Sequence, residues 1–256
     1  MSGWKPLYNH KKRMPRNDRA LLEHEFFTRI PKARKASPVF RSIFDLMYQA
    51  HELARPGKRV LNIYSSPDFS GSREEVYRER FFNECEYEAM DFWEDAFRVD
   101  GSPLPEKHKL PYGDSHFDLV VTTKVIMEHI SEPEDVVREF YRVLKPGGEA
   151  FVIAPLVRRQ HQKPHDYFRY TEYALEHLFR KAGFSEVMLT HTNGGIVTLV
   201  SYLYFFQREL NLPRPIARFF DFVHTRVAEP LSFWLDRLDN GYGRDLTLYF
   251  MVRAQK

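Results

Sequence analysis

The chain has 256 residues, of which 43% are hydrophobic and 29% are charged, which is typical of a globular protein with one substantial α/β domain. The net charge of +3 is too small to indicate nucleic-acid binding by itself. Cys85 is the single cysteine, which excludes an intrachain disulfide, and no signal peptide or apolar run of about 18 residues is present, so we expect a cytoplasmic protein.

Positive charge is concentrated in an N-terminal arm. Residues 1–35 contain ten Lys and Arg against three Asp and Glu, whereas the rest of the chain carries a net charge of −4. We expect this basic arm to precede a single domain at residues 36–256. Two interpretations of the arm are open, a contact with phosphates or anionic lipid and a solvated tail.

Strands and helices are predicted to alternate after the arm. An apolar stripe at helical spacing predicts a helix near residues 40–53, and an apolar strand follows at residues 59–64. A capping box at residues 72–75 predicts a helix that continues to about residue 83. Further strands are predicted at residues 87–92 and 96–99.

The clearest pattern covers residues 116–156. A buried strand at residues 116–123 precedes an amphipathic helix at 131–144. Lys-Pro-Gly-Gly is the stop signal of that helix, and a strand follows at residues 149–156. A strand, a helix and a strand within about 40 residues predict a right-handed parallel crossover.

The C-terminal part contains a predicted insertion. A helix at residues 171–184 ends near Gly183, and strands are predicted at 186–192 and 245–254. Residues 196–243 are rich in Phe, Tyr and Trp and are too long for a hairpin loop, so we expect helices there. Four roles are open for them: a lid, a face for a homodimer or a homologous partner, core helices, and peripheral membrane contact through the flanking arginines.

These segments resemble the class I S-adenosylmethionine-dependent methyltransferases over roughly residues 40–195 and the last strand. The most specific part of the resemblance is LPYGDSHFDLVVTTKVIMEHISEPEDVVREFYRVLKPGGEAFVIAP. It implies an α/β fold with a Rossmann-like seven-stranded sheet, mostly parallel, with helices on both faces and an antiparallel C-terminal strand. It also implies S-adenosylmethionine as the cofactor and a small-molecule methyl acceptor.

The resemblance assigns cofactor-binding residues to the carboxyl ends of the strands. Asp91 matches the acid that binds the ribose, since one carboxylate accepts hydrogen bonds from both hydroxyls. Asp100, with Gly101 beside it, matches the acid that meets the adenine amine, and Thr123 falls in the loop near the sulfonium. In the alternative interpretation the two aspartates only cap loops.

The first cofactor loop departs from the family pattern. The family has acid-x-Gly-x-Gly there, whereas this chain has Asn62, Tyr64 and Ser66 at those positions. Glycine admits positive φ and close approach of a ligand, so its loss changes the loop. Either Ser65, Ser66 and nearby amides bind the cofactor from a reshaped loop, or Tyr64 fills the pocket. In the second case the protein is a catalytically inactive scaffold or a regulatory partner of an active homologue.

The loop after the strand at 149–156 contains the candidates for acceptor chemistry. His165 is the leading candidate for a general base that removes a hydroxyl proton, and His129 is the second. Arg158, Tyr167 and Arg169 are predicted to bind the acceptor, the arginines through a carboxylate or phosphate.

The sequence at residues 164–171, Pro-His-Asp-Tyr-Phe-Arg-Tyr-Thr, is similar to a run in methyltransferase-like proteins of sugar and cell-surface polysaccharide pathways. That resemblance implies a hydroxyl of a sugar or glycolipid intermediate as the acceptor. In the alternative interpretation these residues form a hydrogen-bonded loop in which Arg169 pairs with Asp166 and Thr171 caps the next helix.

Other classes of site find little support in the sequence. The His and acidic residues show no metal-site spacing, so we expect no metal. No P-loop or Gly-x-Ser-x-Gly elbow is present. The basic arm lacks the interleaved aromatic residues of a single-strand nucleic-acid binder, so nucleic-acid methylation is a lesser interpretation.

Overall fold

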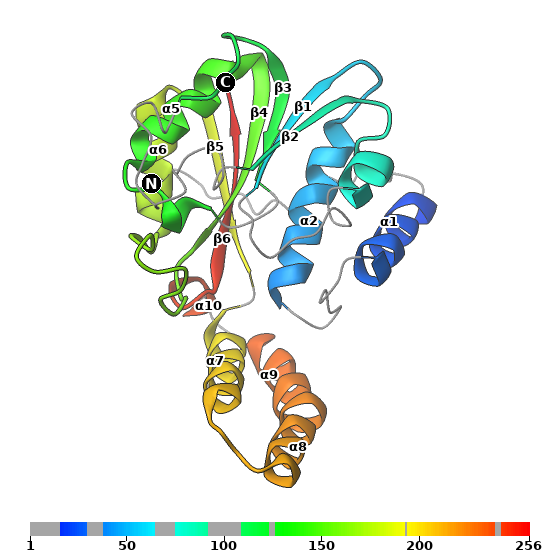
Figure 1. Cartoon of the computed structure of the whole chain (residues 1–256), viewed down its shortest axis with the longest axis vertical. Coiled ribbons are helices and arrows are strands. Elements are labelled where there is room, and N and C mark those ends of the chain that lie inside the picture. Colours follow the sequence, from blue (N-terminus) through cyan, green and yellow to red (C-terminus); the bar gives the residue numbers. More distant parts are fainter. Residues whose placement is uncertain are drawn as a thin grey trace.

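The computed structural model describes residues 16–29, 38–64, 75–91, 109–122, 126–192, 194–238 and 242–256. Its described strands form one six-stranded sheet in the order β2-β1-β3-β4-β6-β5 (Figure 1). They are β1 (Arg59–Tyr64), β2 (Glu86–Asp91), β3 (Phe117–Val121), β4 (Leu144–Pro155), β5 (Glu186–His191) and β6 (Tyr249–Gln255). β1 to β4 pair in parallel, and β6 is antiparallel to both β4 and β5.

The predicted α/β fold, mostly parallel with an antiparallel C-terminal strand, is confirmed. The predicted strand at 96–99 would be the seventh, and it lies outside the described residues. β1 lies between β2 and β3, so the chain order reverses at the boundary of β1 and β3. Open α/β sheets bind ligands at such a switch point, beyond the carboxyl ends of the strands.

Helices cover both faces of the sheet because the strands are apolar on both faces. Successive side chains of a strand point to opposite faces, so Val60 contributes to one core and Leu61 to the other. The first core includes residues of α1 (Arg16–Arg29) and α2 (Pro38–Leu53). The second includes residues of α5 (Pro133–Val143) and α6 (Glu172–Ala182) (Figure 1).

The described part of the basic arm, α1, belongs to the first core. Phe26 is fully buried, and its ring lies edge-on to the ring of Phe44 with 5.5 Å between the centroids. The interpretation of the arm as a solvated tail is therefore wrong for residues 16–29, because the apolar side of this helix packs against α2.

The helices at 40–53, 131–144 and 171–184 form close to their predicted bounds. Thr171 caps α6 as the sequence indicates, since its hydroxyl accepts a hydrogen bond from the amide of Ala174 at 3.2 Å. Gly183 ends α6 in the left-handed conformation at φ 108°. The predicted helix near residues 72–83 is described from Glu75 onward and includes a π-helical turn at Tyr77–Phe81.

The stop signal Lys-Pro-Gly-Gly lies inside β4, because this strand begins at Leu144, directly after α5. The register between β3 and β4 shifts at this point. Gly147 has φ 77°, which favours glycine, and a Cβ on Gly148 would lie 2.9 Å from the carbonyl oxygen of Asp118. The two glycines therefore allow the strand to start irregularly beside β3.

The segment between β5 and β6 is helical, as predicted. It contains α7 (Gly195–Glu209), α8 (Arg214–Val223), a π-helical turn (His224–Ala228), α9 (Glu229–Asp236) and α10 (Tyr242–Asp245). α7 packs on α9, and α7 to α9 project beyond one edge of the sheet (Figure 1). This is the edge where β4 ends, because Pro155 pairs with Tyr249 at the start of β6. None of the helices in the described ranges is long and apolar enough to cross a membrane.

Candidate active site

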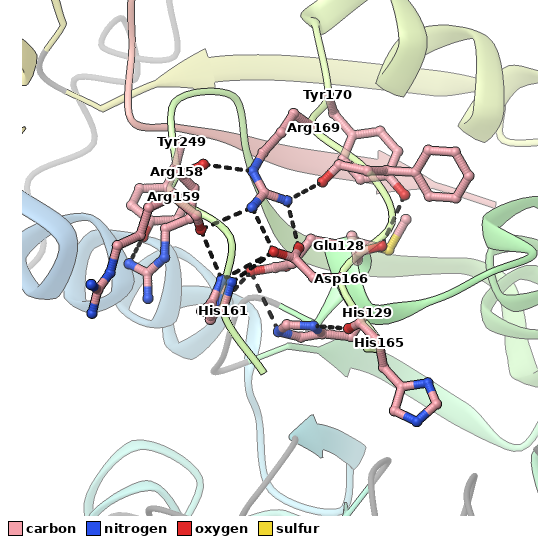
Figure 2. Close-up of polar contacts among 12 residues, drawn as sticks. Glu128, His129, Arg158, Arg159, His161, His165, Asp166, Arg169, Tyr170 and Tyr249 are labelled. Atoms are coloured by element: carbon pink, nitrogen blue, oxygen red, sulfur yellow. Dashed lines mark hydrogen bonds and ion pairs between the residues drawn. The ribbon is translucent and has the colours of Figure 1, made fainter. Parts of the chain in front are cut away.

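Two loops meet at the carboxyl edge of the sheet. The loop after β3 contains a 3-10 turn at Met127–His129, and the loop after β4 continues to Thr171. The amide of Tyr167 donates to the carbonyl oxygen of Glu128 at 2.7 Å, and the hydroxyl of Tyr170 donates to that of Met127 at 2.9 Å. The parallel pairing of β3 with β4 brings these loops together, and their hydrogen bonds hold them as one unit (Figure 2).

Arg169 organises the loop after β4. Its five N–H donors contact five acceptors within that loop: both oxygens of the Asp166 carboxylate and the carbonyl oxygens of Arg158, Arg159 and Phe168. The two contacts with Asp166 are 2.7 and 2.9 Å long and form a bidentate pair. These contacts favour the interpretation of a hydrogen-bonded loop, because a substrate anion would have to displace one of them.

Asp166 is ionised inside this network. Burial raises the pKa of its carboxyl, but the hydrogen bonds from Arg169 and from the amide of His161 outweigh burial and lower the pKa to about 2. The side chain is only 3% exposed. Asp166 therefore carries a buried charge that depends on Arg169 for compensation.

The two candidate catalytic histidines have different surroundings. His129 is buried, and its Nδ1 lies 2.6 Å from the carbonyl oxygen of His165. Burial lowers the pKa of His129, and the charge of Glu128 opposes that shift. His165 is partly exposed, its Nδ1 lies 2.9 Å from the hydroxyl of Tyr167, and its ring points away from His129 (Figure 2).

Two further residues, to which the sequence patterns assign no role, lie at this site. Glu128 is 1% exposed, and its Oε1 lies 3.5 Å from Nε2 of His161 and 3.7 Å from Nε2 of His129. The Glu-His pair in the loop after β3 was visible in the sequence, but no spacing links it to His161. Glu128, His129 and His161 form a cluster between the two loops (Figure 2).

Arg158 connects the loop after β4 to the sheet. Its guanidinium donates a hydrogen bond to the hydroxyl of Tyr249 on β6. Burial raises the pKa of Tyr249 to about 12, so this hydroxyl stays protonated at neutral pH. Arg158 thus has a structural contact in addition to its predicted role in acceptor binding.

The predicted cofactor residues are described only in part. The side chain of Asn62 is fully buried, and its amide donates to the hydroxyl of Tyr87 at 2.9 Å. Tyr64 is half-buried at the end of β1, where its backbone pairs with that of Asp91 at the end of β2. The side chain of Asp91 is not described, and the other predicted residues lie outside the described ranges: Ser65, Ser66, Asp100, Gly101 and Thr123.

Comparison with known proteins identifies the family of the central part of the chain. A model of the methyltransferase domain family matches residues 48–152, which include β1 to β3, α5 and most of β4. The chain belongs to the class I S-adenosylmethionine-dependent methyltransferase superfamily. It is accordingly a methyltransferase that uses S-adenosylmethionine.

Individual relatives of this methyltransferase are distant. It is 26% identical over 229 residues to the ubiquinone/menaquinone biosynthesis C-methyltransferase of Ectopseudomonas mendocina. That alignment covers 66% of this chain and 88% of the relative. A protein of the same name from Laribacter hongkongensis is 31% identical over 107 residues, which cover 39% of this chain and 43% of that relative. A solved S-adenosylmethionine-dependent methyltransferase from Archaeoglobus fulgidus has 13% identity and a TM-score of 0.48, with 82% of this chain and 91% of that chain covered.

The described residues of the methyltransferase fit its cofactor at the switch point. Tyr64 and Asp91 pair through their backbones at the carboxyl ends of adjacent strands, so the predicted ribose-binding acid lies beside the last described residue of β1. Asn62 fits less directly, because its buried amide already contacts Tyr87. Asp91 and the residues after Tyr64 therefore stay predicted cofactor contacts.

Proposed function

We propose that this methyltransferase methylates a hydroxyl of a small polar acceptor, a sugar or glycolipid intermediate. The observation that carries the proposal is the contact between the loop with His165 and Tyr167 and the loop after β3, where the amide of Tyr167 bonds the carbonyl oxygen of Glu128. S-adenosylmethionine, when bound, supplies an electrophilic methyl group. The chain must then aim the acceptor and take up its proton.

His165 takes up that proton in this proposal. If Nδ1–H of His165 donates to the hydroxyl oxygen of Tyr167, Nε2 carries the lone pair and accepts the proton of the acceptor hydroxyl. Tyr167 is 45% exposed, so its ring also offers a surface to the acceptor. Arg169 acts through its hydrogen bonds to the loop, which hold His165 and Tyr167 in place.

Exchange of His165 for Gln tests this role. We expect a fall in kcat of about 10²- to 10⁴-fold with little change in KM, because a proton acceptor is lost and the loop contacts of Arg169 remain. The measurement is transfer of labelled methyl to a panel of sugar and glycolipid hydroxyls. His177→Gln, at an exposed position on α6, is the matched control and should retain wild-type rates. Wild-type kcat in His165→Gln would contradict the assignment.

The same products distinguish a second candidate. The relatives named above are C-methyltransferases of ubiquinone/menaquinone biosynthesis, so a carbon acceptor in a quinone precursor is the alternative. NMR of the labelled product gives the methylated atom. A methyl ether supports the present proposal, and a methyl group on a ring carbon supports the alternative.

The helices α7 to α9 dock this enzyme on an anionic membrane surface. Their exposed apolar side chains, here called the insertion face, are Ile196, Leu199, Leu203, Phe206, Leu210, Ile216, Phe219, Phe220, Phe222, Val227, Leu231, Trp234 and Leu238. On α7 they recur at helical spacing, which makes a continuous apolar stripe. An exposed apolar surface of this extent is typical of a binding site for protein or membrane.

Charge favours a membrane over a second copy of the chain. Among the described side chains of this segment, the arginines Arg214, Arg218, Arg226 and Arg237 are exposed, whereas the acidic residues Asp221, Glu229 and Asp236 are partly buried. A symmetric dimer through this surface would place the same arginines near one another, whereas anionic headgroups complement them. A membrane-bound glycolipid acceptor would suit this arrangement, since the insertion leaves the sheet at the edge where the two active-site loops meet.

A further inference from the structure

Three side chains from the two active-site loops converge on one point. One ligand atom from each of Glu128, His129 and His161 lies within 4.8 Å of the other two. The distances from Glu128 Oε1 to Nε2 of His129 and to Nε2 of His161 are 3.7 and 3.5 Å. Two ligand atoms on a tetrahedral Zn²⁺ lie about 3.3 Å apart, so small side-chain shifts would bring these three atoms to a common ion.

The hydrogen bonds of the imidazoles orient both Nε2 atoms toward the carboxylate. Nδ1 of His129 lies 2.6 Å from the carbonyl oxygen of His165, and Nδ1 of His161 lies 3.1 Å from that of Arg159. A carbonyl only accepts, so each Nδ1 carries its proton, and the neutral ring then has its lone pair on Nε2. Metal-binding histidines characteristically donate their other N–H to such an acceptor.

The carboxylate gives a second, independent observation. Glu128 is 1% exposed, and among the residues that the structure describes its Oε2 has no hydrogen-bond partner. A buried carboxylate oxygen without a hydrogen-bond donor raises the free energy of the folded state. A carboxylate that faces two imidazole lone pairs does so as well, because all three groups are electron-rich. A cation between the three groups removes both costs. Without a metal ion, a proton held between Glu128 and one of the imidazoles would have to serve instead.

The geometry points to a site for a divalent first-row metal ion, with Zn²⁺ as the best match, held by Glu128, His129 and His161. Two imidazoles and one carboxylate are the ligand set of many sites that keep a further position open for water or a substrate oxygen. Asp166 supports this set, since its carboxylate accepts a hydrogen bond from the amide of His161 at 2.8 Å. The site links the loop after β3 to the loop after β4, and it does not depend on the identity of the methyl acceptor.

Titration of the chelator-treated, full-length protein with Co²⁺ tests the site. Co²⁺ reports its own coordination through visible d–d absorption and is displaced by Zn²⁺. We expect one Co²⁺ per chain, and a loss of affinity of about tenfold or more in His161→Asn and Glu128→Gln, because each removes a ligand. His177→Asn, which changes an exposed histidine outside the cluster, should bind as wild type does.

The outcomes separate the metal site from a protonated cluster. His161 is 21% exposed, so His161→Asn is expected to remain folded even if Glu128→Gln does not. Failure of the folded wild type to bind Co²⁺ or Zn²⁺ would overturn the proposal, as would equal affinity in wild type and His161→Asn. Either result would leave the methyl-transfer proposal intact, because metal binding is measured without acceptor or cofactor.

Discussion

Exchange of Arg169 for Ala is expected to lower the free energy of unfolding by about 3 kcal/mol and to remove most methyl transfer. The change leaves the buried carboxylate of Asp166 without its bidentate partner, which typically costs 3–5 kcal/mol in a buried pair. It also removes the donor of three loop carbonyls. The loop that carries His165 and Tyr167 then loses its fixed position. The proposed proton acceptor, His165, is therefore no longer held in place.

Urea denaturation of Arg169→Ala, Arg169→Lys and Arg180→Ala measures this effect. Lys restores the positive charge but not the planar guanidinium with its paired N–H donors. We therefore expect it to recover only part of the lost free energy of unfolding. Arg180 pairs with Glu176 on the exposed surface of α6, and its removal should cost about 0.5 kcal/mol or less. Equal stability of Arg169→Ala and Arg180→Ala would contradict the account.

The effect of Arg169→Ala should depend on pH. The pKa of Asp166 is about 2 in the folded protein, below the ordinary value of 3.8, so its stabilising contribution is present above about pH 4. That contribution is lost as the pH falls toward 2, where the carboxyl becomes protonated. The difference in free energy of unfolding between wild type and Arg169→Ala should therefore be largest near neutral pH and become smaller as the pH falls toward 2.

The double change Phe219→Ser and Phe222→Ser is expected to reduce binding to anionic vesicles by about tenfold or more, roughly 1.4 kcal/mol. Both rings are more than 60% exposed on α8, so their loss removes apolar area that would enter the lipid interface without disturbing a core. Added salt should also weaken binding of the wild type, because the exposed arginines that lie among the residues of the insertion face attract the headgroups.

Co-sedimentation with vesicles of phosphatidylserine and phosphatidylcholine measures this binding, with pure phosphatidylcholine as the uncharged comparison. Tyr173→Ser removes an exposed aromatic residue on α6, outside the insertion face, and should not affect binding. The opposite result has two parts: the wild type does not bind anionic vesicles, and it forms a dimer that the double change dissociates. In that case the insertion face binds a second copy of the chain, and the membrane assignment is wrong.

Much of the fold could be predicted from local patterns. Successive side chains of a strand point to two different cores. The hydroxyl of Thr171 and the positive φ of Gly183 set the two ends of α6 where the sequence places them. The pairing of Arg169 with Asp166 was one of two open interpretations, because the two residues are close in sequence. The docking of α1 was not predicted, since Leu22 and Phe26 make a short apolar pattern within a basic segment.

The candidate site could be predicted only in outline. The sequence placed His129 and His165 in the two loops that meet at the sheet edge, because parallel strands end at the same edge. It did not connect Glu128 with His161, since their contact depends on the folded path of the loop after β4. Nor did it indicate that Arg169 would use all five donors within that loop.

The central claim is that the glycine-poor first loop still holds S-adenosylmethionine, and isothermal titration calorimetry tests it most directly. We expect the folded wild type to bind S-adenosylmethionine or its demethylated product at micromolar strength, about −8 kcal/mol. Asp91→Ala should weaken binding by about tenfold or more, through loss of charge-assisted hydrogen bonds to the ribose. Tyr64→Gly should leave binding unchanged or weaken it. Absence of binding at millimolar cofactor in the folded wild type, with binding gained in Tyr64→Gly, would contradict the account and indicate an inactive partner protein.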